Sequence, residues 1–376
     1  GGSLFGAAVF LLHPVQTESV SYAAGLPEPL GTLWVLLGLL LYAALLTEKT
    51  RREQIKKGSL VILMFVLALF SKESMIVFLP LIFLYHFYSK KPFTRQPYLP
   101  ILVAIGITYL VLRLVVFPAE KLNDGYIDPL FTRLITFVRM LWDYAVLVIY
   151  PVHLHFDREF VIYSSLLSVK GILAGLGLIG SLVLAGLSWG RKRILFFAIG
   201  WFFVAMVPYM GIIPTNATIF EHWLYLPLIG VAVLVAAMFD FMSKGRNKKI
   251  MAGLLIAMLI LFGVRVIERN NDWATAEAFY VHELIYSPES ARLHNAYGIV
   301  AAEKEDLETA IQEWAITVNL DNYFVEAWAN LVRAYYLQGD TENLAGVCAQ
   351  FAVVFPETAE ELCGFYSSLD SDPSSS

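Results

Sequence analysis

The sequence has little charge, few cysteines and none of the common nucleotide or redox motifs. Only 16% of its 376 residues are charged and two are cysteines, whereas soluble domains average about 25% charged residues. A P-loop, a Gly-x-Gly-x-x-Gly fingerprint, a Cys-x-x-Cys pair and a nucleophile elbow are all absent, so ATP-driven transport and thiol redox chemistry have no support. Cys348 and Cys363 could pair in an oxidising compartment, and two free thiols are an equal alternative.

Apolar residues are abundant instead. They make up 58% of the chain, and the mean hydropathy is +0.63, which predicts a polytopic membrane protein. A spanning helix needs about 20 apolar residues. The segments that qualify or come close are 3–12, 29–46, 58–71, 74–88, 99–117, 166–188, 194–210, 224–241 and 250–267, with 58–71 and 74–88 being short.

The basic residues predict the orientation of these segments. Four short loops hold 15 of the 27 Lys and Arg residues, and the positive-inside rule places such loops in the cytoplasm. Residues 13–28, 71–74, 118–165, 211–223 and everything after 267 then face outward. Anionic lipid is sufficient to attract the basic loops, so nucleic-acid binding has no support. The loops contain Lys49, Arg51, Arg52, Lys56 and Lys57; Lys90, Lys91 and Arg95; Arg191, Lys192 and Arg193; and Lys244, Arg246, Lys248 and Lys249.

This alternation of inner and outer loops is consistent only if the apolar stretch 134–151 does not cross the membrane. We expect an interfacial or re-entrant helix at the outer surface, because Trp142, Tyr144 and Tyr150 suit headgroup depth and Arg133 and Arg139 lie among them. The alternative is that 134–151 spans and another segment does not.

Three polar segments adjoin apolar ones. They are residues 13–18 (His-Pro-Val-Gln-Thr-Glu), Lys72-Glu73, and residues 221–227 (Glu-His-Trp-Leu-Tyr-Leu-Pro). Charge at such places is costly unless it reaches water or has a function. Because the predicted sidedness puts all three on the extracytoplasmic face, it favours a single outward-facing site.

The region after Arg265 is amphipathic and acidic and repeats itself. Pro288, Asn322 and Pro356 are 34 residues apart, which is the period of the tetratricopeptide (TPR) repeat, a helix pair. We predict TPR-like repeats over 268–366, about two and a half of them where at least three are normally needed, and a disordered tail over 367–376. Such an array either binds a protein in its groove or serves only for packing.

Taken in order, the motifs resemble one family. Residues 13–18 followed by 25–30 (Gly-Leu-Pro-Glu-Pro-Leu), Lys72-Glu73, Tyr150-Pro151-x-x-Leu154, Pro214-Thr215 with 221–230, and Asn271-Asp272-Trp273 resemble motifs of the transmembrane and TPR-containing protein O-mannosyltransferases and their prokaryotic relatives. The resemblance covers nearly the whole chain. It implies an all-α fold, with a GT-C type membrane domain over 1–267 (about nine membrane helices) followed by the repeats.

The resemblance also implies an activity. GT-C enzymes transfer a sugar, here possibly mannose, from a polyprenyl- or dolichyl-phosphate donor to a protein or cell-surface hydroxyl on the extracytoplasmic side. Two family arginines are replaced here by Leu26 and His222. The family's acidic motif, which carries the catalytic base, follows its first helix. We interpret the start at Gly1, inside apolar sequence, as a truncation that places this main base upstream of the chain.

Transfer from a lipid phosphate needs a proton acceptor and a positive group or metal for the departing phosphate. Glu18 is the expected catalytic residue with His13 in support, and the same two are the candidate ligands if a divalent cation is needed. The alternative is structural, with Thr17-Glu18 as a helix cap and His13 bonded to a carbonyl.

Other polar residues are candidates for binding the donor phosphate or the substrate. Lys72 offers a point charge, and the alternative is a salt-bridged turn. Arg113 lies near a membrane end, where it either binds phosphate or extends to the interface. The candidates are Lys72, Glu73, Glu221, His222, Tyr225, Arg113, Arg139 and Arg158.

The expected partners are a lipid-linked sugar donor, membrane lipid and an acceptor protein held by the repeats. The expected location is a bacterial or archaeal plasma membrane, or the ER membrane in a eukaryote, with the repeats extracytoplasmic. A second hypothesis is a membrane-anchored TPR scaffold without catalysis. An acidic motif in the upstream loop would separate the two.

Overall fold

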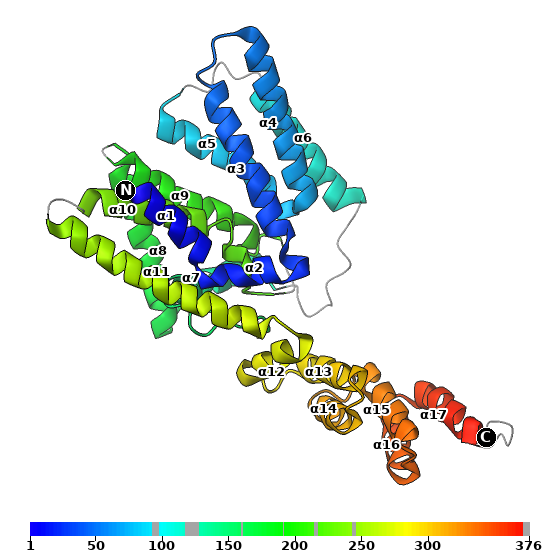
Figure 1. Cartoon of the computed structure of the whole chain (residues 1–376). Coiled ribbons are helices and arrows are strands. Elements are labelled where there is room, and N and C mark those ends of the chain that lie inside the picture. Colours follow the sequence, from blue (N-terminus) through cyan, green and yellow to red (C-terminus); the bar gives the residue numbers. More distant parts are fainter. Residues whose placement is uncertain are drawn as a thin grey trace. The chain divides into compact units, whose positions relative to one another are not determined.

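A computed structural model describes residues 1–91, 98–116, 128–158, 161–190, 192–213, 217–242 and 246–370. Arg95, Arg191, Pro214, Thr215, Lys244 and the tail from Ser371 lie outside these ranges. All regular secondary structure in the described ranges is helical, which confirms the all-α class. The chain divides into two compact units, Gly1–Asn270 and Asn271–Ser376 (Figure 1).

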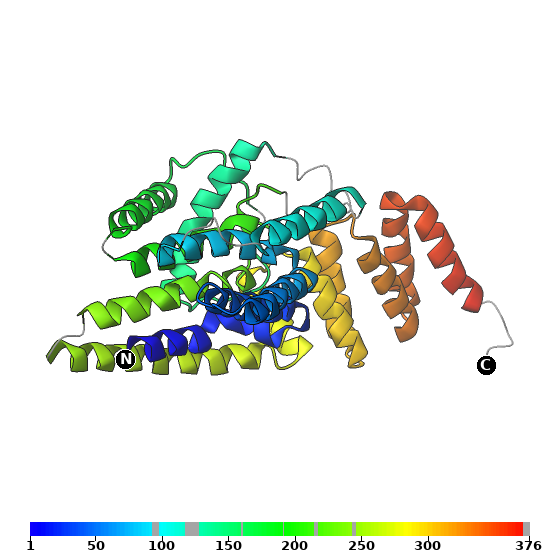
Figure 2. The same ribbon diagram turned by 90° about the horizontal axis from the view of Figure 1, so that it is seen from above.

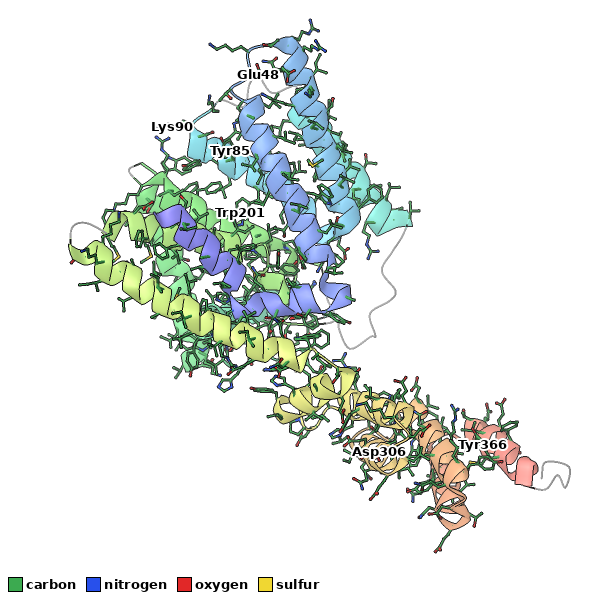
Figure 3. The ribbon with its side chains drawn as sticks, viewed as in Figure 1. Glu48, Tyr85, Lys90, Trp201, Asp306 and Tyr366 are labelled. Atoms are coloured by element: carbon green, nitrogen blue, oxygen red, sulfur yellow. A yellow bond between two sulfur atoms is a disulfide. The ribbon has the colours of Figure 1, made fainter. Side chains whose placement is uncertain are left out.

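The first unit is a helical membrane domain. Helices α3 and α4 run side by side in both views (Figures 1 and 2), and with α5 and α6 they enclose a core that includes Phe65, Phe78 and Leu81. Helices α1, α9 and α10 pack on one another, and α8 packs on α7 and α9. Trp201 of α9 is buried and donates to the Leu226 carbonyl at 2.9 Å (Figure 3). The bounds are α1 Gly2–Leu12, α3 Pro27–Leu45, α4 Arg51–Ser71, α5 Phe78–Ser89, α6 Tyr98–Val111, α7 Leu130–Ile149, α8 Val169–Ser188, α9 Arg193–Met206, α10 Leu228–Met242 and α11 Arg246–Asp272.

Each expected apolar segment lies on a helix. Four helical stretches of the described residues are long and apolar enough to span a membrane, namely Ala23–Leu45, Arg51–Ser71, Val169–Ser188 and Asn247–Asp272. Five further apolar helices are shorter. The segment 58–71 was expected to be short, but its helix begins at Arg51 because the basic residues of the preceding loop continue it.

Helix α7 corresponds to the predicted segment 134–151. One of its faces is buried, with Phe137, Met140, Tyr144 and Leu147 recurring at helical spacing. It is not among the four helical stretches that are long and apolar enough to span. Its place along the outer interface stays a prediction.

Short helices shape the polar segments between the long ones. His13 precedes the 3-10 helix η1 (Pro14–Gln16), and its ring accepts from the Val15 amide. Helix α2 (Thr17–Ser21) follows, and then η2 (Ala23–Gly25). A Cβ at Gly25 would stand 2.8 Å from the Glu18 carbonyl oxygen, so glycine allows this turn to fold against α2. The other short elements are η3 (Glu73–Val77), η7 (Val207–Tyr209) and η8 (His222–Leu224).

The second unit is a run of six helices, each packed on the next. Asp306 and Asp340, 34 residues apart, cap α14 and α16 by accepting from the amides of Thr309 and Asn343 (Asp306 is labelled in Figure 3). Its core includes Trp314, which fills the space over Gly298. The bounds are α12 Ala276–Tyr286, α13 Ala291–Glu303, α14 Leu307–Leu320, α15 Val325–Gln338, α16 Thr341–Val354 and α17 Pro356–Asp370.

The C-terminal end differs from the expectation in two respects. Helix α17 continues to Asp370, so residues 367–370 are helical and not part of a disordered tail; packing of α17 on α15 and α16 stabilises this helix. The two cysteines, for which pairing was left open, form a disulfide between α16 and α17.

Candidate functional site

Two of the three polar segments bond each other in the first unit, and the third is paired with a glutamate outside them. Glu18 of α2 bonds His222 of η8, and Lys72, which precedes η3, bonds Glu28 at the start of α3. These two contacts join sequence positions that are 204 and 44 residues apart. The fold therefore gathers the segments around two buried carboxylates.

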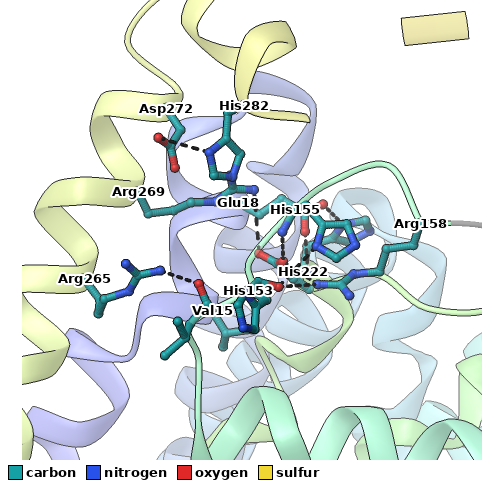
Figure 4. Close-up of polar contacts among 12 residues, drawn as sticks. Val15, Glu18, His153, His155, Arg158, His222, Arg265, Arg269, Asp272 and His282 are labelled. Carbon is teal, nitrogen blue, oxygen red and sulfur yellow. Dashed lines mark hydrogen bonds and ion pairs between the residues drawn. The ribbon is translucent and has the colours of Figure 1, made fainter. Parts of the chain in front are cut away.

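Glu18 is fully buried and is bonded by a single residue on both of its oxygens. Its Oε1 lies 2.5 Å from Nδ1 of His222, and its Oε2 accepts from the His222 backbone amide at 3.1 Å (Figure 4). The His222 ring also stacks on Phe220, with centroids 4.9 Å apart. Carboxylate and aromatic contacts together fix the orientation of this imidazole.

Glu221, the neighbour of His222, forms a second charged cluster. Its Oε1 accepts from the His155 amide at 2.7 Å and from Arg158 Nη2 at 2.8 Å (Figure 4). Arg269 of α11 places Nη2 4.0 Å from its Oε2. Burial raises the pKa of Glu221 to about 7; the Glu18 charge adds to this shift, and the two arginines oppose it.

Glu28 and Lys72 form the third pair. Glu28 is 1% exposed, and its Oε1 lies 2.5 Å from Lys72 Nζ. The Tyr209 hydroxyl donates to the same oxygen at 3.0 Å, and the Tyr209 ring stacks on Trp223 at 4.6 Å. Because Trp223 follows His222 in η8, this stack connects the Lys72 pair to the Glu18 pair.

His13 has a structural position. Its Nε2 bonds the Val148 carbonyl at 2.9 Å, and its Nδ1 accepts from the Val15 amide at 3.3 Å. With both nitrogens engaged, His13 offers neither to a metal. Burial lowers its pKa to about 4, so the ring is neutral. The described ranges contain no group of three His, Cys, Asp or Glu side chains placed to hold a metal ion.

The other four predicted residues bond or pack elsewhere, although Tyr225 also interacts electrostatically with Glu28. Arg139 donates to Asp143 at 2.9 Å within α7 and covers the Tyr163 ring. Tyr225 packs edge-on against Phe10. The remaining two, Glu73 and Arg113, interact electrostatically with Tyr109 of α6.

Sequence reasoning missed Glu28, Tyr209 and Arg269. Glu28 stood within a motif that the resemblance used but received no role. Arg269 is 3% exposed near the end of a long apolar helix, where the rule that singled out Arg113 also applies. Tyr209 carried no signal, because an aromatic residue at the end of an apolar helix is ordinary.

An apolar cavity of about 480 Å³ lies among α7, α8, α9 and α10. Trp142, Gly177, Phe202 and Gly230 are among its lining residues, as is Tyr144. Tyr144 also interacts electrostatically with Arg158 and Glu18. The cavity is therefore next to the charged clusters.

Comparison with known proteins supports the predicted resemblance. The chain is 27% identical over 333 residues to protein O-mannosyl-transferase F38B6.6 of Caenorhabditis elegans, which is 84% of this chain and 46% of that protein. It is 21% identical over 378 residues to protein O-mannosyl-transferase TMTC3 of Mus musculus, which is 89% of this chain and 40% of the relative. The chain thus spans less than half the length of these relatives. No family model and no solved structure matches it.

Proposed function

We propose that this chain is part of a membrane glycosyltransferase that moves a sugar from a polyprenyl- or dolichyl-phosphate donor to a hydroxyl of an acceptor protein. The names of the relatives support a transferase acting on proteins and suggest mannose. The observation that carries the proposal is that two buried carboxylates, Glu18 and Glu28, bond His222 and Lys72 from polar segments that are far away in the sequence. A site that served only as a membrane anchor would have no need for buried charge at these positions.

The donor phosphate is expected beside the cationic residues of the clusters. Arg158 and Arg269 flank the single carboxylate Glu221. A phosphate group that approached these two arginines would receive charge-assisted hydrogen bonds from them. Lys72, whose side chain is 23% exposed, adds a point charge. The candidates for further substrate contacts are Glu73, Tyr225, Arg113 and Arg139. A divalent cation remains the candidate cofactor.

The lipid chain of the donor is expected in the cavity of α7 to α10. The cavity is lined almost entirely by apolar side chains, which suits a polyprenyl chain. Tyr144 lines the cavity and interacts with Arg158 and Glu18, so a chain held there would present its phosphate to the arginines.

The site is expected on the extracytoplasmic side of a multi-pass protein. The disulfide Cys348–Cys363 supports this location for the second unit, because disulfides persist in oxidising compartments. The second unit is expected to bind the acceptor protein. The alternative function is a membrane-anchored scaffold. It would also use the helical repeats, but it gives no role to the buried pairs Glu18–His222 and Lys72–Glu28.

Radiolabelled dolichyl-phosphate mannose, supplied to membranes containing the full-length protein, tests the proposal. Label should pass to protein in wild type and be reduced at least about tenfold by Glu18→Gln and by Lys72→Ala. A second form of the lysine test, Lys72→Met with Glu28→Gln, avoids leaving a buried carboxylate unpaired. The ion pair between Lys57 of α4 and Glu48 in the turn before it, at 2.6 Å (Glu48 is labelled in Figure 3), provides matched controls in Lys57→Ala and Glu48→Gln.

The proposal is wrong if folded wild-type protein transfers no label from any polyprenyl-phosphate sugar. It is also wrong if the Glu18 and Lys72 variants, folded as judged by thermal melting, transfer as well as the two controls. Loss of transfer in the Glu18 and Lys72 variants and in both controls would indicate general instability. The double variant Lys72→Met with Glu28→Gln then decides the role of the lysine.

A further inference from the structure

The most distinctive feature of the site is the replacement of an arginine of the resembled motif by His222. An arginine cannot accept a proton, whereas a neutral imidazole can. The structure shows what surrounds this imidazole, and these surroundings assign it a chemical role. The inference rests on the proposed function and concerns the same site.

The His222 ring is held at one nitrogen and open at the other. Nδ1 lies 2.5 Å from Glu18 Oε1, and the His222 amide donates to Glu18 Oε2. Within the described ranges the hydrogen bond of the ring is the one from Nδ1 to Glu18, and the side chain is 17% exposed. Glu18 therefore fixes the His222 tautomer in which the ring proton is on Nδ1. This tautomer leaves the lone pair of Nε2 available.

The ring cannot turn freely to exchange its two nitrogens. Its face stacks on Phe220 with an interplanar angle of 26°, and Trp223 meets it edge-on at 6.2 Å. Glu18 itself is fully buried on α2. A carboxylate that orients an imidazole whose other nitrogen is accessible is the arrangement by which general bases are positioned in hydrolases.

The surroundings of the ring are mixed in charge. The carboxylate of Glu18 bonds the ring, and the carboxylate of the neighbouring Glu221 is paired with Arg158 and Arg269. Other titratable groups of the elements packed around it include His13, Asp143, Tyr144, His155 and Tyr225, together with Tyr209 next to Trp223.

We infer that His222 is the general base of the transfer reaction, with Glu18 as its positioning residue, in place of the acidic residue that the resemblance places upstream of the chain. As the acceptor hydroxyl attacks the anomeric carbon of the sugar, its proton passes to Nε2 of His222. The oxygen–carbon bond forms while the bond between that carbon and the lipid phosphate oxygen breaks, and its electron pair leaves with the phosphate. Glu18 stabilises the imidazolium, which returns its proton to solvent.

The competing account is that His222 keeps the role of an arginine and binds the phosphate as a cation. The two accounts make opposite predictions for His222→Arg. An arginine restores a permanent cation, so a phosphate-binding residue would keep or gain activity. A general base would be lost, because the guanidinium stays protonated in proteins.

The experiment measures transfer from radiolabelled dolichyl-phosphate mannose by the full-length protein between about pH 5 and 9, for wild type, His222→Arg, His222→Gln and Glu18→Gln. The wild-type rate should rise with pH as one group ionises, and then level. His222→Gln and His222→Arg should each lower kcat by about 10²- to 10⁴-fold and abolish the rise, with donor KM changed less than threefold. His282→Gln, in the second unit, serves as the histidine control.

Glu18→Gln provides a second readout. If it acts through His222, combining it with His222→Gln should cost no more than His222→Gln alone, because the two residues act as a unit. Near wild-type kcat in folded His222→Arg, with an unchanged pH profile, would overturn the inference while leaving the transferase proposal intact. Absence of wild-type transfer would overturn the proposed function and this inference with it.

Discussion

At the scale of single residues, His13 shows how burial determines protonation. The ring is 1% exposed, and burial lowers its pKa from 6.5 to about 4 while the bond to the Val148 carbonyl acts the other way. A group that titrates lower in the folded state binds more protons when unfolded, so folding loses stability as the pH falls below 6.5. The loss should develop between pH 6.5 and 4 and reach about 3 kcal/mol.

Thermal melting of the detergent-solubilised protein against pH measures this loss. His13→Gln keeps a donor near Nε2 for the Val148 carbonyl but has no ionisable ring, so its melting temperature should fall less than that of wild type between pH 6.5 and 4. The comparison of slopes removes the effect of Glu221, whose raised pKa acts in the opposite direction. Equal slopes would show that His13 is not buried in its neutral form.

The same scale shows what a sequence can reveal of a site. Glu18, Lys72, Glu221 and His222 were recognised because charged residues next to apolar helices are unusual. The pairing of Glu18 with His222 was not recognised, because it joins positions 204 residues apart that only the fold brings together. His13 was expected to support catalysis, and its bond to the Val148 carbonyl is the kind of contact that the structural alternative had given it.

At the scale of helices, hydrophobic runs predicted where elements lie better than where they end. Helix α4 begins at Arg51, seven residues before the predicted segment, because arginine, lysine, glutamate and glutamine are good helix formers and continue it. Helix α7 was expected at the outer interface from the sidedness of the loops and from its aromatic and arginine residues; one of its faces is buried, and its place at the interface stays a prediction. The pairing of helices around the cavity could not be predicted, because several apolar faces were equally suitable.

Helix α8 offers a direct test of the cavity. A Cβ added at Gly177 or at Gly180 would meet no atom within 4 Å, and of the two only Gly177 lines the cavity. Gly177→Phe should therefore fill part of the cavity without destabilising the helix, and Gly180→Phe is its control on the same helix. If the cavity holds the lipid chain, Gly177→Phe should raise the donor KM about tenfold, because burial of several methylene groups is lost.

The measurement is the rate of transfer against the concentration of dolichyl-phosphate mannose, with a short-chain polyprenyl donor in parallel. A defect confined to the long-chain donor would place the far part of the chain in the cavity. Unchanged KM for both donors in folded Gly177→Phe would exclude this cavity as the lipid site.

At the scale of the whole molecule, charge is divided between the two units. Residues 271–376 carry 18 of the 32 acidic side chains but only 3 of the 27 basic ones. The basic excess of the first unit is what predicted its orientation. The disulfide independently supports the predicted extracytoplasmic location of the second unit, since cysteines in the reducing cytosol seldom pair.

The last prediction concerns this disulfide. Cys348 and Cys363 are 15 residues apart, and closing a loop of that length stabilises a folded unit by about 3 kcal/mol. In intact cells or sealed microsomes the two thiols should resist a maleimide mass tag unless a reductant is added first. Cys348→Ser with Cys363→Ser should lower the melting temperature of the helices around α16 and α17 and leave the Glu18–His222 site intact. Tagging of both cysteines without reductant, in protein alkylated at lysis to prevent exchange, would place the second unit in a reducing compartment and reverse the orientation derived from the basic loops.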